Sequence, residues 1–229
     1  MYPIVVAAKS QSSRVPRKNF REFYHGKSLV DLTLDLVHSC ELTDQVILST
    51  DESNYSSVHP FTYHQRSASL ATKDTPILDV LNNIIECYNL YSRKYIILLQ
   101  PTSPFRTSSH LTDFFKAIAY YDELHPSSPF SLFSVYQVED AHPARMYHIE
   151  SKRLVPLDPQ LAELQCQFLP SVYHRNGAFY CFSIDSILAG KLYTDLQYPF
   201  LMNSESSVNI DTPLDFEFAQ FLAGQFLPH

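Results

Sequence analysis

The chain has 229 residues, and 45% of them are hydrophobic, which is enough to bury the core of one large domain and excludes a mainly disordered chain. Its formal net charge of −7 argues against a nucleic-acid binder, because affinity for a phosphate backbone comes from massed lysine and arginine. No apolar run approaches the roughly 18 residues of a membrane-spanning helix, and the first one is too short for a signal peptide. We therefore expect a cytoplasmic protein that contacts neither a membrane nor nucleic acid.

The first stretch, residues 2–19, is an apolar run that turns abruptly into a polar loop. Four basic side chains lie in that loop: Lys9, Arg14, Arg17 and Lys18. In an open α/β sheet, ligands bind beyond the carboxyl ends of the strands, and the first strand-to-loop crossing is the usual phosphate site. A basic patch in an acidic protein indicates a small anionic ligand. The plainer alternative is an ordinary solvated loop.

Helices and strands alternate along most of the remaining chain. Apolar spacing predicts helices over residues 27–42, 77–91 and 108–124, and strands over 45–49, 61–66, 95–99 and 131–138. We expect helix caps at Ser28, at Asp74 or Thr75, and at Ser108 or Ser109, and a turn cap at Asp51. The alternation predicts a single α/β domain over residues 1–229, with a mostly parallel, Rossmann-like sheet flanked by helices.

The periodicity fades between residues 139 and 171, where extended pieces at 145–150 and 153–157 are interrupted by prolines. An irregular run of that length is usually an excursion from the main sheet. Several of its side chains, and one just before it, are apolar and need a covering surface: Val138, Met146, Tyr147, Leu154, Val155 and Leu161.

Two further patterns concern the cysteines and the last helix. Cys40, Cys87, Cys166 and Cys181 lack the spacing of a disulfide framework or a zinc site, so we expect four buried thiols. Near the end of the chain, Asp211 or Thr212 is expected to cap a helix that has Pro213 in its first turn. Four side chains of that helix are expected to pack: Phe216, Phe218, Ala219 and Leu222.

Motifs spread over nearly the whole chain resemble those of the CMP-sialic acid synthetase family, which includes pseudaminic and legionaminic acid cytidylyltransferases. They are KSQSSRVPRKN at 9–19, an arginine at 66 followed by DTPILDV at 74–80, LLQPTSPFR at 98–106, LPSVYHRNGAFYCF at 169–182 and NIDTPLDF at 209–216. The third of these is the most specific. The main departures from the family pattern are Lys9, Ser13, Cys166 and Asn209.

The resemblance implies a fold of the nucleotide-diphospho-sugar transferase type, and transfer of CMP from CTP to the anomeric hydroxyl of a nine-carbon sugar acid. Mg²⁺ would be the cofactor, and residues 139–171 would form a dimerisation arm of a homodimer. Phosphoryl transfer depends on charge neutralisation and alignment, which a basic loop and a metal ion supply.

The resemblance also assigns residues to roles. The nucleotide would be bound by Lys9, Ser10, Ser12, Arg14, Lys18, Asn19 and Arg66. The sugar acid would be bound by Gln100, Ser103, His174, Arg175, Asn176 and Tyr180. Asp211 and Asn209 would serve the metal, and Lys18, Arg14 and Asp211 would be catalytic. Two alternatives stay open: a non-catalytic relative that only binds a nucleotide or a subunit, and a synthetase for the eight-carbon acid Kdo.

Overall fold

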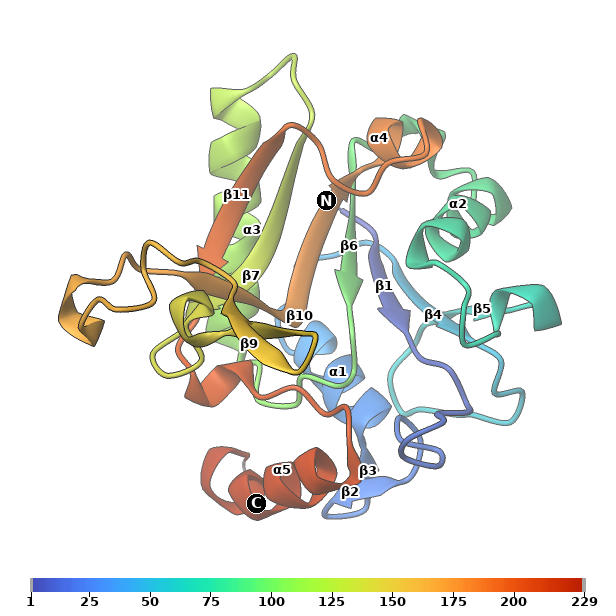
Figure 1. Cartoon of the computed structure of the whole chain (residues 1–229). Helices are drawn as coiled ribbons and strands as arrows, with labels where there is room; N and C mark the ends of the chain where they lie inside the picture. Colours follow the sequence, from blue (N-terminus) through green and yellow to red (C-terminus); the bar gives the residue numbers. More distant parts are fainter. Residues whose placement is uncertain (1, 228–229) are drawn as a thin grey trace.

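The computed structural model describes residues 2–227. A central sheet of seven strands lies between two layers of helices, with strand order β11-β7-β10-β6-β1-β4-β5 (Figure 1). The strands are β1 Ile4–Ala7, β4 Val46–Thr50, β5 Thr62–Gln65, β6 Tyr95–Leu99, β7 Phe130–Gln137, β10 Tyr173–Ser183 and β11 Leu196–Leu201. All pairs are parallel except those of β10, which runs antiparallel to β6 and β7. The predicted α/β class and Rossmann-like sheet are confirmed, and the sheet is mixed.

The middle of the sheet is made of the most apolar runs in the chain. Every residue of β4 and β6 is buried, as expected of parallel strands that are covered by helices on both faces. Helices α1 (Leu29–His38) and α3 (Ser108–Leu124) pack on one face. Helices α2 (Ile77–Cys87) and α4 (Ile184–Leu188) pack on the other (Figure 1).

The last helix, α5 (Pro213–Phe226), lies apart from these two layers, beside the small ribbon of β2 (Glu22–Tyr24) and β3 (Lys27–Ser28) (Figure 1). Phe216 and Ala219 are buried against Phe23, while Leu222 is half-buried. Phe218 is 53% exposed, so the prediction that it packs is wrong. This packing brings the segment before α5 to the loop that follows β1.

The predicted helix caps are partly confirmed. Ser28 caps α1 and Thr212 caps α5, each in a reciprocal capping box. The predicted cap of α3, Ser108 or Ser109, is one or two residues late: the cap is Thr107, which is extended and whose hydroxyl accepts from His110 N. Neither Asp74 nor Thr75 caps α2: the helix begins after Pro76, and the Thr75 hydroxyl bonds to Ser69 O and to Thr72 instead.

The cysteine prediction is mostly wrong. Cys181 is buried in β10, but Cys40 is half-buried and Cys87 and Cys166 are exposed. All four of these thiols are free. In the part of the chain that the structure describes, no helix is both long and apolar enough to cross a membrane.

Residues 139–171 form an excursion from the sheet, as predicted. Its hairpin of β8 (Tyr147–Glu150) and β9 (Arg153–Pro156) is a separate two-stranded sheet, drawn in gold (Figure 1). Ile149 is 78% exposed, and Leu154 and Phe168 are each 68% exposed. The excursion thus presents apolar side chains that the monomer does not cover.

Candidate active site

A cleft of about 700 Å³ opens at the carboxyl ends of β1 and β6, where the loop after β1 meets the segment before α5. We call it the basic cleft, because five cationic side chains line it: Lys9, Arg14, Lys18, Arg66 and Lys73. Asp211 is the one carboxylate in its wall. Six of the seven residues predicted to bind nucleotide line this cleft; Ser10 is the exception.

Ser10 and Asp51 hold the loop to the sheet. The backbone N and Oγ of Ser10 donate to the two carboxylate oxygens of Asp51, at 2.7 and 2.6 Å. Burial raises the pKa of Asp51, but these two hydrogen bonds outweigh it and the pKa is lowered. The prediction that Asp51 caps a turn is therefore wrong: β1 and β4 are neighbours, so the carboxylate after β4 reaches the loop after β1.

Hydrogen bonds within the loop hold its remaining residues in place. Asn19 Nδ2 donates to the carbonyl of Lys9 at 3.0 Å, and Val15 N donates to Ser12 Oγ at 3.4 Å. Ser12 and Asn19 thus have structural partners and also border the cleft.

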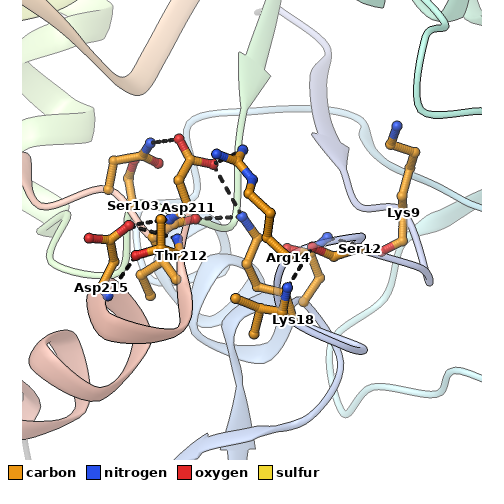
Figure 2. Close-up of polar contacts among 12 residues, drawn as sticks. Lys9, Ser12, Arg14, Lys18, Ser103, Asp211, Thr212 and Asp215 are labelled. Carbon is orange, nitrogen blue, oxygen red and sulfur yellow. Dashed lines mark hydrogen bonds and ion pairs between the residues drawn. The ribbon is translucent and has the colours of Figure 1, made fainter.

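Lys18 and Arg14 converge on Asp211, as Figure 2 shows. Arg14 Nη2 lies 3.0 Å and Lys18 Nζ 3.5 Å from Asp211 Oδ1, and Lys18 Nζ also donates to Ile210 O at 2.5 Å. Lys18 is 8% exposed, and burial lowers its pKa although Asp211 opposes the shift. The three predicted catalytic residues are therefore together, on two segments far apart in sequence.

Lys9 and Arg66 approach the cleft differently. Lys9 points away from Asp211 and donates to Thr72 O at 2.8 Å (Figure 2). Arg66 is 6% exposed, and burial lowers its pKa to about 10 although Asp51 opposes the shift. Its Nη2 atom is buried and has no partner, so it retains a donor that can serve a ligand.

A second cavity of about 490 Å³ adjoins the basic cleft and shares Ile77 and Gln100 with it. We call it the aromatic pocket; its ring-bearing lining residues are Tyr173, His174, Tyr180, Phe182 and Tyr193. Gln100, His174, Arg175 and Tyr180 all line it, so the structure brings four of the six predicted sugar-binding residues together.

Arg175 lies against two aromatic rings of this region. Its guanidinium carbon is 5.0 Å from the ring centre of Tyr193 and 5.7 Å from that of Phe133, and it donates to the Tyr193 hydroxyl. These contacts hold a cation at the pocket without a carboxylate partner among residues 2–227.

Asn176 and Ser103, also predicted to bind sugar, lie behind the pocket wall. Asn176 is 4% exposed, its Oδ1 accepts from Ser134 Oγ and Ala178 N, and its Nδ2 donates to Ser207 Oγ. Ser103 is fully buried and donates to the Asn176 carbonyl. The structure therefore does not bring these two side chains to the pocket with the other four, and both bond to interior groups of the fold.

Gly177 explains part of the asparagine–glycine motif. It has φ +81°, and a Cβ at this position would lie 3.1 Å from Gln100 Oε1. Glycine therefore lets the strand pass close behind Gln100, which forms the junction of the two cavities.

Residues 4–182 match the family model described as cytidylyltransferase. The chain belongs to the cytidylyltransferase family. It is similar to the CMP-N,N'-diacetyllegionaminic acid synthase of Legionella pneumophila, with 28% identity over 95% of this chain and 94% of that protein. The pseudaminic acid cytidylyltransferase of Campylobacter jejuni is 26% identical over 95% of this chain and 94% of its own length.

Two further similarities are more limited. The N-acylneuraminate cytidylyltransferase of Streptococcus agalactiae is 27% identical over 94% of this chain, which spans 52% of that protein. The solved CMP:2-keto-3-deoxy-manno-octonic acid synthetase complexed with CTP superposes with a TM-score of 0.67, 14% identity and coverage of 99% of this chain and 100% of the other. At that identity the likeness establishes the fold.

The sequence motifs missed several residues that line the site of this cytidylyltransferase. Lys73 lines the basic cleft, and Leu192 and Tyr193 line the aromatic pocket. Lys73 could have been found, since it is a cation directly before the DTP motif. Tyr193 lies outside every motif, so no pattern in this sequence indicated it.

The donor set of this cytidylyltransferase fits a magnesium ion that arrives on phosphate. Among residues 2–227, no group of three or more acidic, histidine or cysteine side chains could hold a metal ion. Asp211 is 47% exposed at its side chain, and its Oδ2 accepts from Asn209 Nδ2 at 3.0 Å. One carboxylate and an amide suit Mg²⁺ that keeps waters and phosphate ligands. Binding of the ion would then require Asp211 to lose part of its contact with Asn209 Nδ2 and Arg14 Nη2.

Proposed function

We propose that this cytidylyltransferase transfers CMP from CTP to the anomeric hydroxyl of a nonulosonic acid and releases pyrophosphate. The continuity of the two cavities at Gln100 carries the proposal. The basic cleft offers cations to a triphosphate, and the aromatic pocket offers Arg175 to a carboxylate. The two substrates would meet at the junction.

The reaction forms a bond between the sugar oxygen and the α-phosphorus and breaks the bond from that phosphorus to the pyrophosphate oxygen. The hydroxyl loses its proton, and pyrophosphate leaves with the electron pair. Lys18 and Arg14 would neutralise phosphate charge at fixed positions, because their contacts to Ile210 and Asp211 already orient them.

Mg²⁺ is part of the proposal. Asp211, with the amide oxygen of Asn209, would hold it, and when bound it would supply positive charge that stabilises the phosphate oxygens. Asn209 also donates to Asp211 in the structure, which orients that carboxylate.

The names of the relatives support a nine-carbon acid acceptor of the legionaminic, pseudaminic or N-acylneuraminic type. A Kdo synthetase stays the rival within the same chemistry, and the solved structure of that name supports it only at the level of fold. A non-catalytic relative stays the rival of another class, because Asn209 stands where an acid is expected.

The assembly and location are also proposed rather than observed. The exposed apolar side chains of residues 139–171 support a homodimer in which this excursion packs on the partner subunit. A cytoplasmic location is part of the same proposal.

The test is a pyrophosphate-release assay with CTP, Mg²⁺ and a panel of sialic, pseudaminic and legionaminic acids, with Kdo as a separate arm. We expect release with one or more of the nine-carbon acids and none without acceptor. Release with Kdo alone would establish the rival substrate. No release in any arm, with CTP still bound, would establish the non-catalytic alternative.

A further inference from the structure

Arg66 is held in the floor of the basic cleft by an uncharged partner. Its Nε donates to Ser49 Oγ at 2.9 Å, and Ser49 Oγ lies 2.9 Å from His64 Nδ1. His64 Nε2 in turn lies 2.9 Å from Asn83 Oδ1. Among residues 2–227, Ser49 is the one side chain that bonds to this guanidinium. A row of polar groups therefore runs from α2 through the sheet to the cleft.

The fold places these groups in register. Ser49 and His64 face each other as partners of the parallel strands β4 and β5. Arg66 follows β5 directly, and its backbone N donates to Thr50 O at 2.9 Å. Ser49 is fully buried and His64 is 3% exposed, so water does not compete for their hydrogen bonds.

Counting protons gives one arrangement for a neutral ring in which Ser49 Oγ, both ring nitrogens of His64 and Asn83 Oδ1 all have partners. Because Ser49 Oγ accepts from Arg66, its own proton is available for His64 Nδ1. Nδ1 must then be the bare nitrogen, and Nε2–H donates to Asn83 Oδ1. Burial lowers the pKa of His64 although Asn83 opposes the shift, which agrees with a neutral ring.

We propose that Ser49, His64 and Asn83 are positioning residues that fix the Arg66 guanidinium in the basic cleft with its unpartnered Nη2 presented to the nucleotide. The inference rests on the proposed function for the identity of that ligand. An uncharged partner has a physical consequence: a carboxylate bonded to Nε would offset much of the Arg66 charge, whereas the Ser49 hydroxyl orients the guanidinium without adding a negative charge. Asp51 is near enough to act on that charge but does not bond to the guanidinium.

The ligand-free protein tests the geometry without reference to function. In nitrogen-15 NMR, the His64 ring should carry its proton on Nε2, and the Arg66 Nε–H should exchange slowly with solvent. Ser49→Ala should make that exchange fast. A proton on Nδ1 of the wild-type ring, or no change of exchange in Ser49→Ala, would overturn the proposal.

The kinetic test is a double-mutant cycle on kcat/KM for CTP. Ser49→Ala should lower kcat/KM about tenfold, mostly through KM, the size expected for one hydrogen bond to a charged group. In an Arg66→Ala background the same change should have almost no effect, because Ser49 acts through Arg66. Ser183→Ala is the matched control: it removes a buried, hydrogen-bonded serine that is the last residue of β10 and lines neither cavity.

His64 supplies a second variant in case Ser49→Ala folds poorly. His64→Gln can still accept from Ser49 and donate to Asn83, so it should retain more CTP affinity than His64→Leu. Equal losses in both variants, or additive losses in the double-mutant cycle, would reject a positioning role.

Failure of the proposed function can be distinguished from failure of the positioning role of Ser49, His64 and Asn83. Wild-type protein would then release no pyrophosphate, and the cycle would be measured on CTP binding by calorimetry instead. Protein that binds no CTP would refute the positioning role together with the proposed function.

Discussion

Lys18 lies where the loop after β1 meets the segment before α5, and it is the most buried of the cations around Asp211. Burial of its ammonium is offset by the Ile210 carbonyl and by Asp211. The side chain is therefore already in place before a triphosphate arrives, which reduces the entropy lost on binding.

Replacing Lys18 with Ala should weaken CTP binding by about 1.5–3 kcal/mol, the range for a hydrogen bond to a charged group, or roughly 10- to 150-fold in Kd. Isothermal calorimetry measures this directly. Lys116→Ala is the control, because Lys116 is an exposed lysine of α3 that pairs with the exposed Asp113. Unchanged CTP affinity in Lys18→Ala would remove Lys18 from the nucleotide site.

Asn209 and Asp211 give a prediction about the metal. Asn209→Asp should lower the Mg²⁺ concentration that gives half-maximal rate, since a second carboxylate strengthens attraction to the ion. Asp211→Asn should abolish turnover with little change in Tm. The magnesium titration of initial rates decides it: a higher Mg²⁺ requirement in Asn209→Asp would contradict the assignment.

Asp51 gives a prediction about pH. Its pKa is lowered in the folded protein, with burial opposing and the Ser10 hydrogen bonds prevailing, so it stabilises the fold above its unfolded pKa of about 3.9. That stabilisation is lost as the pH falls through the lower, folded pKa. Asp51→Asn should cost about 1 kcal/mol at neutral pH, after allowance for partial exposure, and progressively less in acid. Denaturant unfolding across pH checks it; a pH-independent difference would contradict it.

At the scale of elements, the sequence predicted those segments whose local pattern agrees with their packing. The β6 strand and α3 have the predicted bounds, because an unbroken apolar run and a strong helical face admit one interpretation. The edge strand β11 was missed: it contains Pro199, and its side chains are half or fully exposed. The α4 helix is too short to show a period.

The site residues, like the elements, could be predicted from the sequence only in part. The motifs correctly gathered Lys18, Arg14 and Asp211, since the family pattern preserves the order of loops around one sheet edge. They could not separate a side chain that lines a cavity from one that supports its wall. Asn176 supports the wall, because its side-chain amide forms hydrogen bonds with four partners in the interior.

The excursion at residues 139–171 exposes apolar side chains, which predicts self-association. The protein should be a dimer at micromolar concentration, and Leu154→Lys should shift it toward monomer, because a charge replaces a 68% exposed apolar side chain of β9. Sedimentation velocity measures the state. Val58→Lys, at a 93% exposed valine outside the excursion, is the control. A wild-type protein that sediments as a monomer would refute the prediction that residues 139–171 form a dimerisation arm.

In the whole molecule, two adjoining cavities meet at the carboxyl end of β6: one is lined by cations and the other mainly by aromatic side chains. The basic cleft depends on segments from both ends of the chain, since the loop after β1 supplies cations and the segment before α5 supplies Asp211. The aromatic pocket depends on β10 and on the residues that follow α4. Gln100, at the end of the central strand β6, lies at the boundary of both.

The central claim is that CTP and a nonulosonic acid react across this boundary. The most direct measurement uses CTP labelled at the α-phosphorus, with wild-type protein, Mg²⁺ and each acid in turn. The label should appear in a CMP-sugar acid and not in pyrophosphate, and Asp211→Asn should form no such product. Absence of labelled sugar product from wild type with every acid, or labelled pyrophosphate, would contradict the account.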